Sequence, residues 1–256
     1  METVYVPIAG MVKAAIWVMG WKMIVTGEEH LPREGPAVLV SNHVSYLDPV
    51  MLGWVTDRQR RIPRFLAKQE LFDHRVIGPV MRRLRQVPVD RFGDRTLSLR
   101  VGVERLGEGD YVVVFPEGTI STSFVPAEPR AGAARLALQS GAALIPVALW
   151  GGQRIATKYR ARNLQRGIVL VIRIGSPVPY ESDEPPEQVT QRVWEAVQGL
   201  VDAAQRTYPQ RPRDPEDRWW LPRHLGGTAP TPAQAEQRRR EEQALRRARR
   251  AAEADG

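Results

Sequence analysis

Two residues in the segment NHVSYLDP have the types and spacing of an acid–base pair. His43 follows the apolar run PAVLVS (residues 36–41), and Asp48 comes five positions later, immediately before Pro49. A proline suits the first turn of a helix, so we expect a turn that lets Asp48 fold back towards the imidazole. A carboxylate on one ring nitrogen fixes the tautomer and makes the other nitrogen a better base, able to take a proton from an alcohol. Spacing alone leaves open that Asp48 only caps a helix and that His43 is only a polar residue at a strand end.

A second polar cluster follows the strand-like run YVVVF (residues 111–115). The tetrapeptide PEGT (116–119) comes next, and Gly118 in it allows a sharp turn whose N–H groups can hold phosphate oxygens. Another short apolar run, QVPVD (86–90), is followed by Arg91, whose guanidinium suits a phosphate or a carboxylate. Taken singly, the two features are also typical of a strand-end turn and of a surface salt bridge.

Composition excludes several kinds of chemistry. None of the 256 residues is cysteine, which excludes disulfides, cysteine nucleophiles and cysteine-ligated metals. The four histidines are scattered, so we expect no metal site. The formal net charge is +8, and the segment from Asp57 to Arg95 carries 11 basic against 5 acidic residues, or +6 of that excess. The charge favours an anionic partner: an acidic membrane surface, a phosphorylated small molecule or a nucleic acid.

Apolar runs alternate with helix-like segments along the middle of the chain. Strands are predicted at 36–41, 62–68, 86–90, 111–115, 143–149 and 168–174. Helices are predicted from Pro49, at 76–84, from an N-cap at Asp94 to Gly107 or Gly109, at 130–141 and at 185–206. This alternation predicts an α/β fold with a largely parallel sheet covered by helices on both faces. We place this domain at residues 28–208.

The amino-terminal stretch is the most apolar part of the chain. Residues 4–25 are long enough to span a bilayer, but Lys13 near their middle and Pro7 disfavour a straight spanning helix. Trp17 and Trp21 suit a helix that lies in the headgroup layer. We therefore expect residues 1–27 to be a helical segment that docks on the cytoplasmic face of a membrane, where anionic lipids would also meet the basic segment. The alternative is a buried core helix.

Composition changes again near residue 209. Residues 209–256 are first rich in proline and glycine and then strongly charged, which predicts a mobile tail or a frayed helix. Trp219 and Trp220 in this tail have two interpretations, as anchors to the domain or to a membrane.

The order of the motifs is more specific than any one motif. NHVSYLDP is followed by a strand that ends in Arg91, then by FPEGT and then by IPV (145–147). This order resembles the glycerophospholipid acyltransferase family of the HxxxxD type, and most of all its 1-acylglycerol-3-phosphate (lysophosphatidic acid) acyltransferases. The resemblance runs from about residue 25 to residue 180, and its first and third motifs are the specific ones.

The resemblance implies a reaction, its partners and a set of residues. His43 and Asp48 fall on the family's catalytic pair. The family's site for the acceptor phosphate falls on Arg91, Glu117, Gly118 and Thr119. The implied reaction moves a fatty acyl group from acyl-CoA or acyl-carrier protein to the hydroxyl of a lysophospholipid, most simply from lysophosphatidic acid to phosphatidic acid, in phospholipid biosynthesis. The implied partners are that lysophospholipid, the acyl thioester and an anionic membrane surface; no cofactor, metal or nucleic acid is expected.

Two positions depart from the family pattern. The third motif usually continues Gly-Thr-Arg, but Ile120 stands at the arginine position, and Arg85 stands where the second motif usually opens with glycine. One phosphate-binding cation is therefore missing, and charge alone makes Arg85, Lys68 or Arg130 the candidates to replace it. Because this cation is missing, other acyl acceptors remain alternatives, namely glycerol 3-phosphate or a lipid head group without phosphate. A non-catalytic lipid-binding protein and a nucleic-acid binder are the remaining alternatives.

Overall fold

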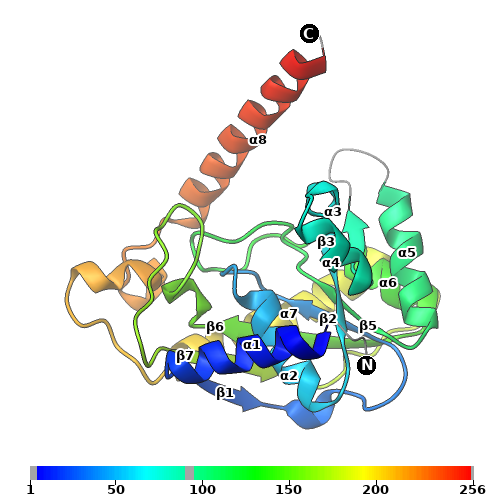
Figure 1. Cartoon of the computed structure of the whole chain (residues 1–256), viewed down its shortest axis with the longest axis horizontal. Coiled ribbons are helices and arrows are strands. Elements are labelled where there is room, and N and C mark those ends of the chain that lie inside the picture. Colours follow the sequence, from blue (N-terminus) through cyan, green and yellow to red (C-terminus); the bar gives the residue numbers. More distant parts are fainter. Residues whose placement is uncertain (1–4, 90–94, 255–256) are drawn as a thin grey trace.

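A seven-stranded sheet organises the chain in this computed structural model, which describes residues 5–89 and 95–254 (Figure 1). The strands run in the order β1-β7-β6-β2-β5-β3-β4. Their bounds are β1 (Lys22–Thr26), β2 (Ala37–Ser41), β3 (Pro63–Lys68), β4 (Val87–Val89), β5 (Tyr111–Val114), β6 (Ala143–Trp150) and β7 (Val169–Ile174). Neighbouring strands are parallel except β6 and β7, which are antiparallel. The largely parallel sheet that the sequence predicts is confirmed.

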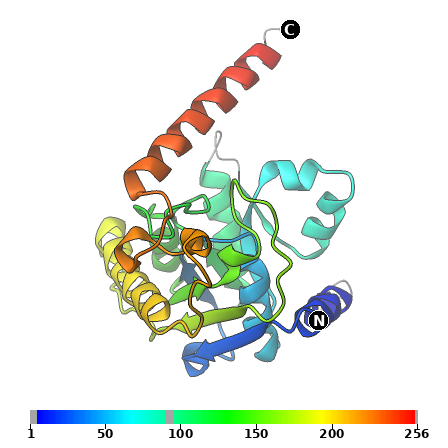
Figure 2. The same ribbon diagram turned by 90° about the vertical axis from the view of Figure 1, so that its left-hand side faces the viewer.

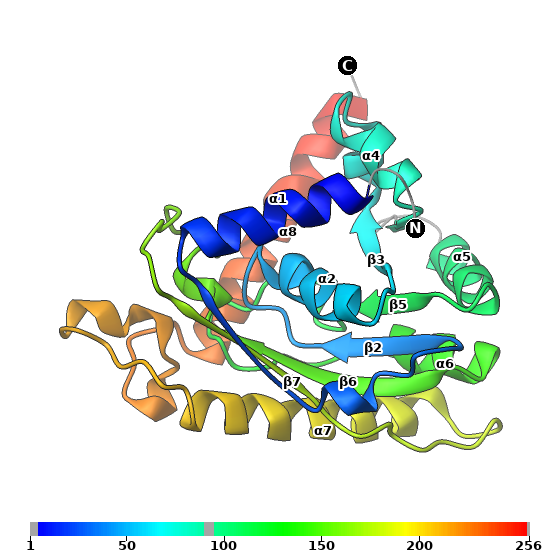
Figure 3. The ribbon, with the colours of Figure 1, turned by 60° about the horizontal axis from the view of Figure 1, so that its bottom comes forward.

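Helices cover both faces of the sheet. The α-helices of the described residues are α1 (Tyr5–Val18), α2 (Asp48–Arg58), α3 (Gln69–Asp73), α4 (Ile77–Arg83), α5 (Arg95–Gly107), α6 (Gly132–Ser140), α7 (Pro186–Arg206) and α8 (Pro232–Ala254). Figure 3 shows α6 and α7 on one face and α2, with α1 lying over it, on the other. Helix α8 projects away from these layers (Figures 1 and 2).

The central strand β2 shows why the sheet is buried on both faces. All five of its residues are buried. Val38 and Val40 pack with α6 and α7, whereas Leu39 packs with Met51 and Leu52 of α2. Successive side chains of a strand point to opposite faces, so a strand covered on both sides must be apolar throughout. The prediction of a buried strand from the apolar run at 36–41 is therefore confirmed.

Most predicted elements are confirmed within one or two residues, but the amino-terminal prediction is wrong in one respect. Residues 4–25 do not form one helix: α1 ends at Val18, and Lys22–Thr26 is the edge strand β1, parallel to β7. Gly20, with φ of +61°, turns the chain between the two elements. An apolar run does not by itself distinguish a helix from a buried strand. Within the described ranges no helix is both long and apolar enough to cross a membrane.

The carboxyl-terminal segment is anchored to the domain through Trp220. This side chain is 1% exposed and packs edge-on against Tyr208, with ring centroids 5.6 Å apart. The guanidinium of Arg154 lies over the same indole, 4.5 Å from its centroid. Of the two interpretations of Trp220, the structure therefore supports the anchor to the domain. After this anchor the chain forms α8, so a helix occupies the predicted charged tail.

Candidate active site

The candidate site is built from loops that follow three neighbouring strands, and two of these loops carry expected polar residues. The loop after β2 carries His43, the loop after β5 carries residues 116–119, and a third loop, residues 151–168, follows β6. Because β6, β2 and β5 are parallel neighbours, their carboxyl ends lie at the same edge of the sheet. Open α/β sheets bind ligands at this edge.

His43 and Asp48 are in direct contact. The Nδ1 atom of His43 lies 2.8 Å from Oδ2 of Asp48, which is a hydrogen-bond distance. The Asp48 side chain is completely buried, whereas 18% of the His43 side chain is exposed. The carboxylate therefore orients the ring from the protein side, and solvent or a substrate can still reach the imidazole.

The turn between the two residues explains this contact. Oδ2 of Asp48 also accepts hydrogen bonds from the backbone N–H groups of Val44, at 2.7 Å, and Ser45, at 2.8 Å. Asp48 is the first residue of α2, and Pro49 follows it in the first turn. The side chain thus binds the turn before the helix instead of capping the helix. The predicted fold-back of Asp48 is present.

Two further residues hold His43 in place. The side-chain amide of Asn42 accepts from the backbone N–H of Leu149 at 2.8 Å and donates to its carbonyl at 3.0 Å, which ties the end of β2 to β6. The Phe115 ring stacks on the imidazole with centroids 4.2 Å apart and an interplanar angle of 19°. These contacts restrict both the main chain and the ring of His43. Asn42 and Phe115 are the first residues of the motifs NHVSYLDP and FPEGT, but their types alone did not indicate a role.

Glu117 binds the main chain of the neighbouring loop. Its Oε1 accepts from the N–H of His43 at 2.9 Å, and its Oε2 accepts from the N–H of Ala127 at 3.1 Å. The residue is 2% exposed. Burial raises the pKa of Glu117 to about 8, although the two backbone hydrogen bonds act in the opposite direction. The carboxyl group therefore connects the loops after β2 and β5.

Gly118 and Thr119 form the turn after Glu117. Gly118 has φ of +68°, in the left-handed region that favours glycine, and its N–H donates to the carbonyl of Phe115 at 2.9 Å. A Cβ atom at Gly118 would lie 3.5 Å from Cζ of Arg130, so this guanidinium lies against the turn. The hydroxyl of Thr119 accepts a hydrogen bond of 2.7 Å from Nζ of Lys158.

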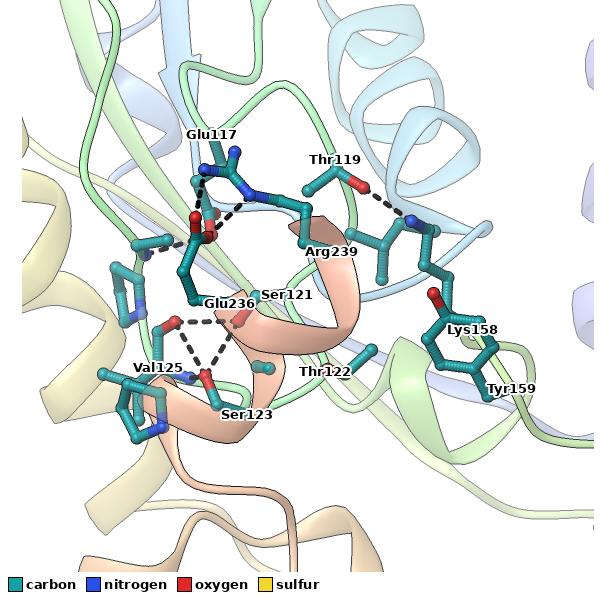
Figure 4. Close-up of a pocket in the computed structure, with 15 residues that line it drawn as sticks. Glu117, Thr119, Ser121, Thr122, Ser123, Val125, Lys158, Tyr159, Glu236 and Arg239 are labelled. Carbon is teal, nitrogen blue, oxygen red and sulfur yellow. Dashed lines mark hydrogen bonds and ion pairs between the residues drawn. The ribbon is translucent and has the colours of Figure 1, made fainter. Parts of the chain in front are cut away.

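A cavity of about 70 Å³ opens beside this turn (Figure 4). The loop after β5 supplies Glu117, Thr119 and Ile120 to its wall, and the loop after β6 supplies Lys158. The first turns of α8 close the other side. Ile120 is 5% exposed, so the position next to Thr119 contributes an apolar surface and no charge.

The other cations named as candidates have different positions. Arg91 lies outside the described residues, so its role as a phosphate ligand stays a prediction. Asp94 also lies outside them, so its expected role as a helix N-cap stays a prediction too. Arg85 forms an ion pair with Glu108. Sequence reasoning missed Lys158, because it belongs to no motif and 39 residues separate it from Thr119.

The chain is similar to known acyltransferases. Residues 22–150 match the family model described as Acyltransferase. A 1-acyl-sn-glycerol-3-phosphate acyltransferase of Bacillus subtilis is 32% identical over 127 residues, which are 50% of this chain and 62% of that protein. A protein of the same name from Streptococcus pneumoniae is 24% identical over 219 residues, 85% of this chain and 80% of that one.

A solved structure supports the same comparison. The crystal structure of the 1-acyl-sn-glycerophosphate (LPA) acyltransferase PlsC from Thermotoga maritima superimposes with a TM-score of 0.67 and 26% sequence identity. The match covers 80% of this chain and 81% of that one. Some curated relatives match over a smaller share of their length: the chain spans 62% of the Bacillus protein and 58% of a relative from Borreliella burgdorferi.

Proposed function

The chain belongs to the acyltransferase family, and on that premise we propose that it moves a fatty acyl group from a thioester to the hydroxyl of a lysophospholipid. The contact of 2.8 Å between His43 and Asp48 carries this proposal. It joins a partly exposed imidazole to a buried carboxylate, the arrangement that general-base chemistry on an alcohol needs.

In the proposed mechanism, His43 takes the proton of the acceptor hydroxyl through Nε2. The alcohol oxygen then attacks the thioester carbonyl carbon, and the carbon–sulfur bond breaks as the tetrahedral intermediate collapses. The proton on Nε2 passes to the leaving thiolate, so that an ester and a free thiol are the products. Asp48 holds the ring through Nδ1 and stabilises the imidazolium while it carries the proton. Donors of this class are acyl-CoA and acyl-carrier protein.

The proposed acceptor is 1-acylglycerol 3-phosphate, converted to phosphatidic acid in phospholipid biosynthesis. The relatives from Bacillus subtilis and Streptococcus pneumoniae support this choice, because both are named 1-acyl-sn-glycerol-3-phosphate acyltransferases. The turn at Gly118 and Thr119, with the guanidinium of Arg130 against it, is the proposed binding place for the phosphate. Ile120, next to Thr119, brings no charge to this binding place. The test of the proposal therefore includes acceptors without a phosphate.

We also propose that α1 docks the protein on the cytoplasmic surface of a membrane. Its apolar side chains are widely exposed: Met11 is 66% and Trp17 is 81% exposed. Only Tyr5 among the residues of α1 is buried, with its hydroxyl 3.2 Å from the carbonyl of Gly53 in α2. An apolar helix that lies on the protein surface and keeps an aromatic residue exposed suits the headgroup layer.

A thiol-release assay tests the transfer. The full chain in detergent–lipid micelles receives one acyl-CoA with 1-acylglycerol 3-phosphate, 1-acylglycerol or glycerol 3-phosphate, and free CoA is measured. We expect release with the first acceptor and a loss of about 10²- to 10⁴-fold in the rate on His43→Ala. His224→Ala, which removes an exposed histidine, is the matched control. Transfer by His43→Ala at the parent rate would refute the mechanism.

A further inference from the structure

Lys158 is a cation on the wall of the cavity beside Thr119; the other cationic side chain among its described lining residues, Arg239, pairs with Glu236. Its Nζ donates 2.7 Å to the hydroxyl of Thr119 and lies 3.3 Å from Oε2 of Glu242, in α8 (Figure 4 shows the contact with Thr119). The Lys158 side chain is 19% exposed and that of Glu242 is 27% exposed. An ammonium group has three donors, and these two contacts engage two of them.

The main chain places Lys158 beside the loop of His43. The hydroxyl of Thr157, the preceding residue, donates 2.8 Å to the carbonyl of Val44. The N–H of Tyr46 donates 3.1 Å to the carbonyl of Ala156. The segment that ends at Lys158 is thus hydrogen-bonded to the turn between His43 and Asp48. Glu117, which also lines the cavity, accepts a hydrogen bond from the backbone N–H of His43 at the start of the same turn.

The contact with Glu242 shows that the position accepts an anion. A carboxylate from a helix that projects away from the domain neutralises Lys158, and Tyr159 also donates 2.8 Å to that carboxylate. A partly exposed ion pair of this kind stabilises a protein only weakly, because solvent screens the two charges. A phosphate brings more charge and three acceptor oxygens, so it can displace a single carboxylate at little cost to the fold.

We propose that Lys158 binds the phosphate of the acyl acceptor, and that Glu242 occupies this position in the unliganded protein. The Thr119 hydroxyl, which Lys158 already contacts, completes the site as a second hydrogen-bonding group. The site lies in the cavity next to the turn that follows His43, so it would hold the acceptor by the end that does not react. The kinetic part of this inference rests on the proposed acyl transfer; the binding of phosphate does not.

The kinetic test compares two acceptors that differ only in the phosphate. With 1-acylglycerol 3-phosphate, Lys158→Met is expected to raise KM about 10- to 100-fold, the loss of one charge-assisted hydrogen bond, with kcat much less affected. The rate with 1-acylglycerol is expected to equal that of the parent. Lys158→Arg, which keeps the charge, is expected to restore most of the affinity. Arg206→Gln, which removes the cation of an exposed ion pair on α7, is the matched control and leaves both rates unchanged.

A binding test is independent of turnover. Calorimetric titration of the full chain with glycerol 3-phosphate is expected to show binding by the parent, tighter binding by Glu242→Gln, and none by Lys158→Met with an unchanged melting temperature. Equal losses with both acceptors, or unchanged titration of folded Lys158→Met, would overturn the assignment. Binding through Lys158 without thiol release from any acceptor would instead refute only the acyl transfer.

Discussion

Glu117 holds the backbone of His43: its Oε1 accepts a hydrogen bond of 2.9 Å from the His43 N–H. Its second oxygen accepts from Ala127, ten residues further along the loop after β5. One buried side chain thus fixes the spacing between the loop that carries the proposed base and the loop proposed to bind the phosphate. Glu117 as a direct ligand of the acceptor stays a prediction. Both its oxygens already have partners within the protein.

The raised pKa of Glu117 predicts a pH-dependent stability. Burial raises this pKa from 4.5 to about 8, so between these pH values the folded protein keeps a proton that the unfolded chain releases. The free energy of unfolding therefore falls as the pH rises through this range. Glu117→Gln has no carboxyl group to titrate at this position. The difference in the free energy of unfolding by which the parent exceeds this variant should therefore become smaller as the pH rises towards 8. Denaturant unfolding at a series of pH values measures this difference.

The control for this prediction is Glu128→Gln, an exposed neighbour in the same loop, which should follow the parent at every pH. A gap between parent and Glu117→Gln that stays constant or widens as the pH rises would contradict the raised pKa.

Asp48→Asn tests the orienting role of the carboxylate. Asparagine keeps the size of the side chain, and its oxygen can still accept from Val44 and Ser45, but it brings no charge to stabilise an imidazolium. We expect kcat to fall by roughly 10²- to 10⁴-fold with KM nearly unchanged. Thiol release measures kcat and KM, and a melting curve shows whether the variant is folded. Asp202→Asn, on the surface of α7, is the control; an unchanged kcat in folded Asp48→Asn would show that the pair is not catalytic.

Exposed side chains of α1 predict the strength of membrane docking. Met11→Ser combined with Trp17→Ser removes two exposed apolar groups and should weaken binding to anionic vesicles at least about tenfold, since a buried side chain of this size contributes roughly 1.5–3 kcal/mol. Cosedimentation with phosphatidylglycerol-rich vesicles measures the binding. Leu97→Ser combined with Leu245→Ser removes exposed apolar groups on α5 and α8 and serves as control. Equal binding by both double variants would refute docking through α1.

Trp220→Ala tests whether the segment after α7 belongs to the folded domain. The indole is 1% exposed between Tyr208 and Arg154, and its removal should lower the free energy of unfolding by about 3–5 kcal/mol. The neighbouring Trp219 is only half-buried, so Trp219→Ala should cost less. Denaturant unfolding compares the two. A similar loss in the free energy of unfolding for both variants would contradict the prediction that Trp220 contributes more to the core than Trp219 does.

The local sequence pattern was enough to predict most helices and strands and the contact between His43 and Asp48. Strands such as β2 are continuous apolar runs because both faces are covered, and α7 shows its apolar stripe directly in the sequence. His43 and Asp48 are only five positions apart, so the geometry of the turn between them follows from local turn and helix-start preferences. Edge strand β1 was missed because its alternating pattern is short and adjoins an apolar helix.

The sequence by itself determined the alternation of strands and helices, the contact of His43 with Asp48 and the absence of cysteine chemistry. Only the tertiary structure decided that Lys158 meets Thr119, that Glu242 reaches both Lys158 and Tyr159, and that Trp220 is buried against Tyr208. Lys158 and Thr119 are 39 positions apart in the sequence, and Lys158 and Glu242 are 84 positions apart. Tyr208 and Trp220 are 12 positions apart. No local periodicity encodes such pairs, because they depend on which strands become neighbours and on where the loops after those strands meet.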